Sequence, residues 1–184
     1  MTAPTNRGTV WQALSEADQG AIRAAFRPLG IVSPGEMVTS ASGIAVLIGH
    51  LKQPELRHVG YRLIALSEDL AARENDPVQL HYYFHGVGKF FYRFRDFDDF
   101  ALSKAIEAFE RQTRLSAIVA TRLAGSLGGT APGHAGFDQL RIIHEKAGNY
   151  LEAIKVCQAA QTDGWAGDWE KHINRLTSKI IKSG

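Results

Sequence analysis

The sequence predicts an all-α fold of about eight helices, arranged in stacked antiparallel pairs. Apolar residues recur at alternating spacings of three and four, which places them on one face of a helix. A capping residue followed by proline, a typical helix start, precedes several of these runs. No stretch shows the period of two that a half-buried strand would give.

Clear start and stop signals mark the first helices. Ser15 is suited to cap a helix that ends before Pro28. Ser33 and Pro34 form a stronger start, and the apolar stripe after them predicts one helix over about 34–52.

Two further helices follow with matched apolar stripes. Pro54 opens the first of them, and the pair Asp76-Pro77 opens the second, whose stripe reaches Phe94. The connections are short and leave no room for a crossover. We therefore expect these helices to be antiparallel neighbours.

The second half begins with a helix expected to reach about residue 124, with a bend near Gln112-Thr113. Residues 125–136 contain five glycines and a proline and are predicted to be a mobile loop. Phe137 to Ala160 then indicates two short helices across a tight Gly-Asn turn. A last helix begins near Gly167.

Composition restricts the class of protein. The 184 residues are 45% hydrophobic and 22% charged, which is typical of a soluble globular chain. A net charge of +2 gives no overall field that would favour nucleic acid or a membrane. Cys157 is the only cysteine, and the longest apolar run, Ile44 to Ile48, is too short to span a bilayer. We expect a cytoplasmic protein.

The segment from Phe137 to Ala160 resembles a tetratricopeptide repeat, a helix-turn-helix unit that stacks into solenoids. Its bulky, glycine, aromatic and small positions are filled by Phe137, Leu140, Gly148, Tyr150, Ala153 and Ala160. Arg141 and His144 depart from the pattern, because the family has a small residue and a tyrosine at these positions.

The resemblance implies a right-handed superhelix in a single domain over residues 11–184, after a flexible tail over residues 1–10. The clearest repeat is 134–167, and a more divergent copy covers 77–113. In such a solenoid the first helix of each repeat lines a concave groove.

That implication points to the helix that starts at Pro77. Its residues opposite the apolar stripe would form the partner-binding surface, with a cationic ladder between two tyrosines: Tyr82, His85, Lys89, Tyr92 and Arg93. Such a surface suits an acidic peptide, a terminal carboxylate or a phosphate. The alternative is that these residues form ion pairs with Asp96, Asp98, Asp99 and neighbouring helices.

Other chemistries receive less support. His81 and His85 are spaced to share a helix face, but further metal ligands and an H-E-x-x-H motif are missing. The glycine-rich loop lacks the Gly-Lys-Ser/Thr ending of a phosphate loop. We predict no cofactor, no metal and no catalytic residue. The basic last helix, carrying Lys171, Arg175, Lys179 and Lys182, is interpreted as a solvated face.

The preferred function is a non-enzymatic adaptor or scaffold that binds a protein or peptide, including an acidic one. One alternative is a self-associating structural subunit whose interface uses aromatics of the Pro77 helix and Trp165 or Trp169. The other is a helical enzyme or nucleic-acid-processing accessory with a His/Asp/Arg site.

Overall fold

The computed structural model describes residues 9–30 and 33–183. This part of the chain is helical, as predicted, apart from two short strands. Its α-helices are α1 (Thr9–Ala13), α2 (Glu16–Phe26), α3 (Ala41–His50), α4 (Arg57–Ala72), α5 (Pro77–Arg93), α6 (Ala101–Arg114), α7 (Ser116–Leu127), α8 (Ala135–Lys146), α9 (Tyr150–Thr162) and α10 (Trp169–Ser183). Three short 3₁₀ helices cover Arg27–Leu29, Pro34–Thr39 and Pro54–Leu56. No helix in the described ranges is long and apolar enough to cross a membrane.

The helices are more numerous than the eight expected. Two of the expected helices are broken, and α1 lies where a tail was predicted. Residues 1–8 of that tail fall outside the described part, but α1 begins at Thr9 and Val10 is buried. Contacts group the chain into two compact units, one ending at Ala105 and the other beginning at Ile106, inside α6.

The prediction of one helix over 34–52 is wrong for the first part of that range. Pro34–Thr39 forms a 3₁₀ segment in which Val38 leaves helical geometry, and a new α-helix, α3, begins after Ser40. The Oγ of Ser40 accepts a hydrogen bond from the Gly43 amide at 3.1 Å, whereas the Ser33 side chain makes no capping bond. Ser40 is therefore the cap of this helix.

Two glycines let helices of the first unit approach α5 closely. A Cβ on Gly86 of α5 would lie 2.7 Å from the Cβ of Ala45 on α3. A Cβ on Gly60 of α4 would lie 2.1 Å from the Cζ of Phe90 on α5. Both positions therefore have space for hydrogen only, and α5 packs against α3 and α4 at short range.

α5 is capped as the sequence predicts, because the Asp76 side chain accepts from the Val78 amide at 3.1 Å. Its predicted stripe is buried at Phe84, Val87 and Phe91. Burial extends well beyond that stripe, to His81, Tyr83, Gly86, Gly88 and Phe90. The helix is thus buried over most of its circumference, and only one narrow side remains open.

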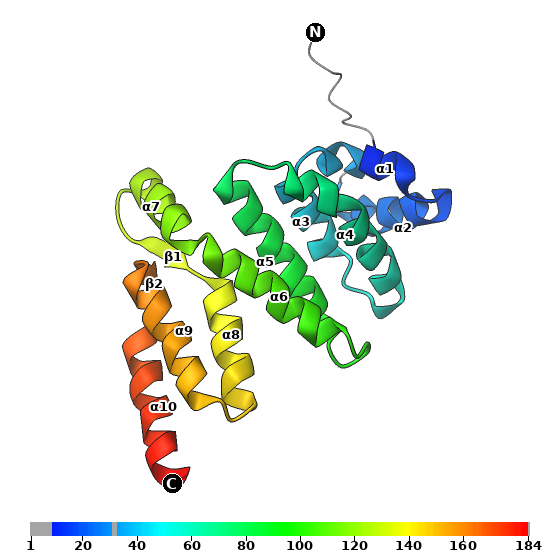
Figure 1. The fold of residues 1–184 in the computed structure, drawn as a ribbon. Coiled ribbons are helices and arrows are strands. Elements are labelled where there is room, and N and C mark those ends of the chain that lie inside the picture. The colour runs from blue at the N-terminus through cyan, green and yellow to red at the C-terminus, as the bar shows by residue number, and fades with distance from the viewer. Residues whose placement is uncertain (1–8, 31–32, 184) are drawn as a thin grey trace. The chain divides into compact units, whose positions relative to one another are not determined.

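In the second unit α8, α9 and α10 lie side by side (Figure 1). The hairpin expected over 137–160 is confirmed as α8 and α9, and Gly148 in the turn has φ of 77°. Ala153, Cys157 and Ala160 are fully buried on α9. Small residues on this face allow the neighbouring helices to pack closely.

The glycine-rich segment is more regular than a mobile loop. Residues 125–127 complete α7, β1 (Ala131–Gly133) follows, and α8 starts at Ala135. β1 pairs in parallel with β2 (Trp165–Ala166), with Ala131 opposite Trp165. Strands of two and three residues are too short for a period-two pattern to reveal.

The bend expected near Gln112-Thr113 is present a few residues later. α6 ends at Arg114 and α7 begins at Ser116. Ser116 is buried, and its hydroxyl donates to the Asp163 carboxylate, which ties the bend to the end of α9.

Candidate functional site

The predicted partner-binding residues all lie on the open side of α5, and we call them together the α5 strip: Tyr82, His85, Lys89, Tyr92 and Arg93. Tyr82 is 45% exposed and Lys89 is exposed, whereas the other three are half-buried. The strip is narrower than the broad groove surface that the resemblance implies, because most of α5 is packed.

The aspartates that follow α5 do not neutralise the strip. Asp98 accepts from Arg57 Nε at 3.0 Å and from Tyr61 Oη at 2.9 Å. Asp96 pairs with Arg95 at 3.3 Å.

Lys89 and Arg93 make no ion pair within 4.0 Å among the described residues, whether with Asp99 or with any other carboxylate. The pairing expected as the alternative is therefore absent from this part of the chain.

Arg93 is the least usual member of the strip. Its Nη1 atom is buried and has no hydrogen-bond partner among the described residues. Burial lowers the pKa of its guanidinium, which nonetheless keeps its charge, because an arginine is not deprotonated in proteins. A half-buried cation without a counter-charge is costly, so this position favours the arrival of an anion.

His85 does not act as a third cation. Burial, followed by the charge of Lys89, lowers the pKa of its imidazole below the ordinary 6.5. The ring is therefore neutral at pH 7, and the predicted ladder carries two positive charges instead of three.

His81, four residues earlier, is buried and close to His85. Burial and the neighbouring His85 lower the pKa of His81 to about 4. Within the described ranges no three His, Cys, Asp or Glu side chains gather in a geometry that could hold a metal ion.

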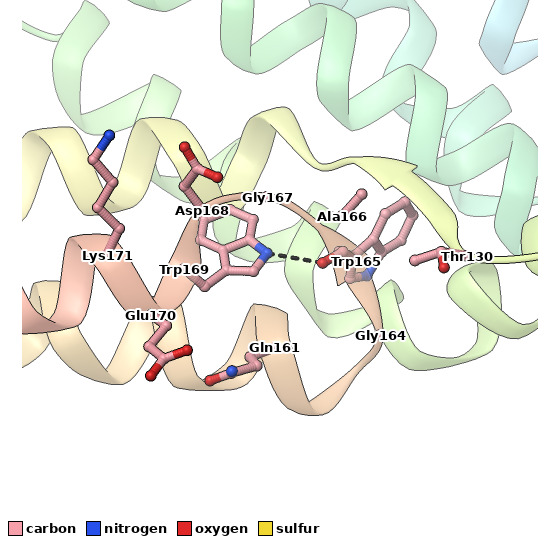
Figure 2. A pocket seen from close by; sticks show the side chains of 10 residues that line it. All are labelled: Thr130, Gln161, Gly164, Trp165, Ala166, Gly167, Asp168, Trp169, Glu170 and Lys171. Carbon is pink, nitrogen blue, oxygen red and sulfur yellow. Dashed lines mark hydrogen bonds between the residues drawn. The ribbon is translucent and has the colours of Figure 1, made fainter.

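The second unit has a hollow of about 480 Å³ where β2 leads into α10 (Figure 2). Trp165 and Trp169 form part of its wall, and Trp169 Nε1 donates to the Trp165 carbonyl at 2.8 Å. Asp168, Glu170 and Lys171 are the charged side chains of its lining. The lining contains no cysteine, serine or histidine, so it offers no nucleophile with an adjacent imidazole base.

Sequence reasoning missed an ionic cluster between α8 and α10. The Glu145 carboxylate accepts two bonds from the Arg175 guanidinium, one of them at 2.7 Å, and one from Lys179 Nζ at 2.8 Å. Arg141 Nη1 also donates to it, at 3.4 Å. The hydrogen bonds from Arg175, then those from Lys179, lower the pKa of Glu145 to about 2. The four-residue spacings 141/145 and 175/179 were visible, but not the contact between the two helices.

The tryptophans named for a self-association interface are not available for it. Trp165 and Trp169 are each only 3% exposed. The exposed aromatics of the described residues include Tyr82 on α5 and Phe97 and Phe100 in the connection to α6.

Comparisons of the chain with protein-family models, with curated proteins and with solved structures give no match. The tetratricopeptide resemblance therefore stays a prediction.

Proposed function

We propose that this protein is a non-enzymatic adaptor that binds an acidic protein or peptide through the α5 strip, in the manner of a helical-repeat scaffold. The observation that carries the proposal is that two neighbouring cations of α5 have no carboxylate partner among the described residues. Lys89 is exposed, Arg93 is half-buried with an unpartnered Nη1, and neither has a carboxylate partner among the described residues.

The spacing of these cations suits an acidic side chain. Residues four apart on a helix are neighbours, so Lys89 and Arg93 can bind one carboxylate or two adjacent ones. An anion that reaches Arg93 would supply the missing hydrogen-bond acceptor in a partly dry environment, where a charge-assisted bond is stronger than at an open surface.

The two tyrosines add an amphipathic contact area on both sides of the cations. Tyr82 is 45% exposed, and the Tyr92 ring is covered on one face by the Arg95 guanidinium at 4.3 Å. Tyrosine is enriched at the centres of protein interfaces because its ring is apolar and its hydroxyl can hydrogen bond. The partner we propose therefore presents an acidic residue next to an apolar one.

The test compares two double variants by fluorescence anisotropy with a labelled octaglutamate peptide. Lys89→Ala/Arg93→Ala should weaken binding about tenfold or more, from the loss of one exposed and one partly buried charged contact. Arg27→Ala/Lys52→Ala is the control. It removes the same charge from two exposed positions of the same unit that lie outside the strip. Equal affinities for the two variants, or no binding by the unmodified protein, would contradict the proposal.

Neither alternative has an observation of comparable weight. Self-association would have to use the aromatics of α5, Tyr82 and Tyr92, because both tryptophans named for that interface are buried. An enzymatic or nucleic-acid-processing role would need a gathered His/Asp/Arg site, and burial lowers the pKa of both α5 histidines, which leaves them neutral at pH 7. We also propose a cytoplasmic location, since the chain has a single cysteine.

A further inference from the structure

The C-terminal helix α10 carries a line of like charges along one side. We define the cationic stripe as Lys171, Arg175, Lys179 and Lys182. Spacings of four, four and three keep these residues on one face of the helix, over a length of about 16 Å. Like charges four residues apart destabilise an isolated helix, so such a line needs compensation from elsewhere.

The ion pairs of the stripe meet at one residue of α8. Arg175 and Lys179, in the middle of the stripe, both bind the carboxylate of Glu145, which also accepts from Arg141. Three cations thus converge on one anion. Asp138 is the next carboxylate, and it lies 3.7 Å from Arg141.

The buried end of this cluster also has spare hydrogen-bonding capacity. The Arg141 side chain is only 9% exposed, and its Nε atom is buried without a hydrogen-bond partner among the described residues. In contrast to the buried Arg141, the Lys171 and Lys182 side chains at the two ends of the stripe are exposed. They form no ion pair with a described residue. Positive charge therefore exceeds negative charge around Glu145 and at the Lys182 end of the stripe, whereas Asp168 and Glu170 line the hollow together with Lys171.

We infer that the cationic stripe is a docking surface for an extended acidic peptide segment. Every second residue of an extended chain points to the same side, with a repeat of about 7 Å. Successive cations four residues apart on a helix are about 6 Å apart, so alternate acidic residues can follow the stripe in register. Glu145 holds the central cations in place, and the segment binds their solvent side together with the two end lysines.

A peptide is favoured over a nucleic acid as the occupant. Single-stranded nucleic acids are bound with aromatic side chains on which the bases stack. The Tyr150 ring lies 5.6 Å from Lys179 Nζ, but the two tryptophans, Trp165 in β2 and Trp169 at the start of α10, are each 3% exposed and offer no row of rings on which bases could stack. The inference is separate from the α5 strip, because the stripe lies in the other unit.

The experiment removes only the two end lysines, so that the contacts of Glu145 remain. Lys171→Gln/Lys182→Gln should weaken octaglutamate binding about 2- to 30-fold, the value expected for two exposed ion pairs. The control Lys52→Gln/Lys155→Gln makes the same change of net charge at exposed positions outside the stripe and should leave binding within about twofold.

The same measurement in the Lys89→Ala/Arg93→Ala background separates the two surfaces. If the stripe binds acidic segments, Lys171→Gln/Lys182→Gln weakens the remaining binding there as well, whether or not the α5 strip contributes. Equal affinities for the stripe variant and its control would overturn the inference. So would tighter binding of a short DNA duplex than of octaglutamate, because the surface would then belong to a nucleic acid.

Discussion

Gly60→Ala tests the packing that leaves only one side of α5 open. The new methyl group would lie 2.1 Å from Phe90 Cζ, and 2.6 and 2.8 Å from the two Cε atoms of that ring. A Cβ atom essentially never lies under 3.0 Å from a neighbouring atom of this kind, so the ring or the helix has to move. The ring has little freedom, since Phe90 is 1% exposed and its centroid lies 5.0 Å from that of Phe94 and 5.6 Å from that of Tyr61.

The magnitude follows from two opposing effects. Overpacking of a filled core costs about 3 kcal/mol when the overlap is severe. Alanine recovers about 1 kcal/mol of helix propensity relative to glycine. The net loss is therefore about 2 kcal/mol. The control is Gly20→Ala in α2, where nothing lies within 4 Å of the added carbon, so only the propensity gain of about 0.5–1 kcal/mol applies.

Urea denaturation followed by circular dichroism measures both variants. A second variant, Phe90→Leu, removes ring atoms from the clash, so Gly60→Ala should cost less than about 1 kcal/mol in that background. If Gly60→Ala is as stable as Gly20→Ala, then α4 does not pack on α5 as described. The assignment of the α5 strip to the open side of α5 would then be wrong as well.

Three further predictions concern capping and pH. Ser40→Ala should destabilise the protein by about 1 kcal/mol in urea, whereas Ser33→Ala should have almost no effect, because only Ser40 caps a helix with its side chain. Glu145→Gln should cost about 1–2 kcal/mol at pH 7, a value reduced for the exposure of its partners. A pKa lowered to about 2 means that this stabilisation is present above the ordinary pKa of 4.5 and is lost as pH falls to 2, so the two proteins should have similar stability at pH 2. His81 has a pKa lowered to about 4, so it should remain neutral at pH 5 in an NMR titration. Because the imidazole is protonated more readily in the unfolded chain, the free energy of unfolding should fall as pH falls from 6.5 towards 4.

The helical class and most helix starts could be predicted because they depend on local signals. Ser15 and Asp76 cap their helices through bonds to the backbone two or three residues ahead. The helix start predicted at Ser33 is wrong although its local signal is good. The chain first forms a 3₁₀ segment after Ser33, and the α-helix begins only after Ser40. The pairing of β1 with β2 joins segments more than thirty residues apart and has no local pattern.

The exposure of the candidate site residues could be predicted in part. Helical periodicity placed Lys89 and Arg93 on the side of α5 opposite its apolar stripe. It could not reveal how much of the rest of α5 is packed, because glycines such as Gly60 and Gly86 carry no side-chain signal for close approach. It also could not predict that Glu145 would meet cations of α10, because that contact depends on tertiary packing.

Chemical-shift mapping by NMR during titration with octaglutamate tests the central claim most directly, because it reports where an acidic ligand binds without a mutation. The account predicts that the largest amide shifts fall on the α5 strip, and a second, weaker set on the cationic stripe. The first set should disappear in Lys89→Ala/Arg93→Ala, while the second remains. Shifts confined to the connection around Phe97, or no shifts at all, would contradict the account.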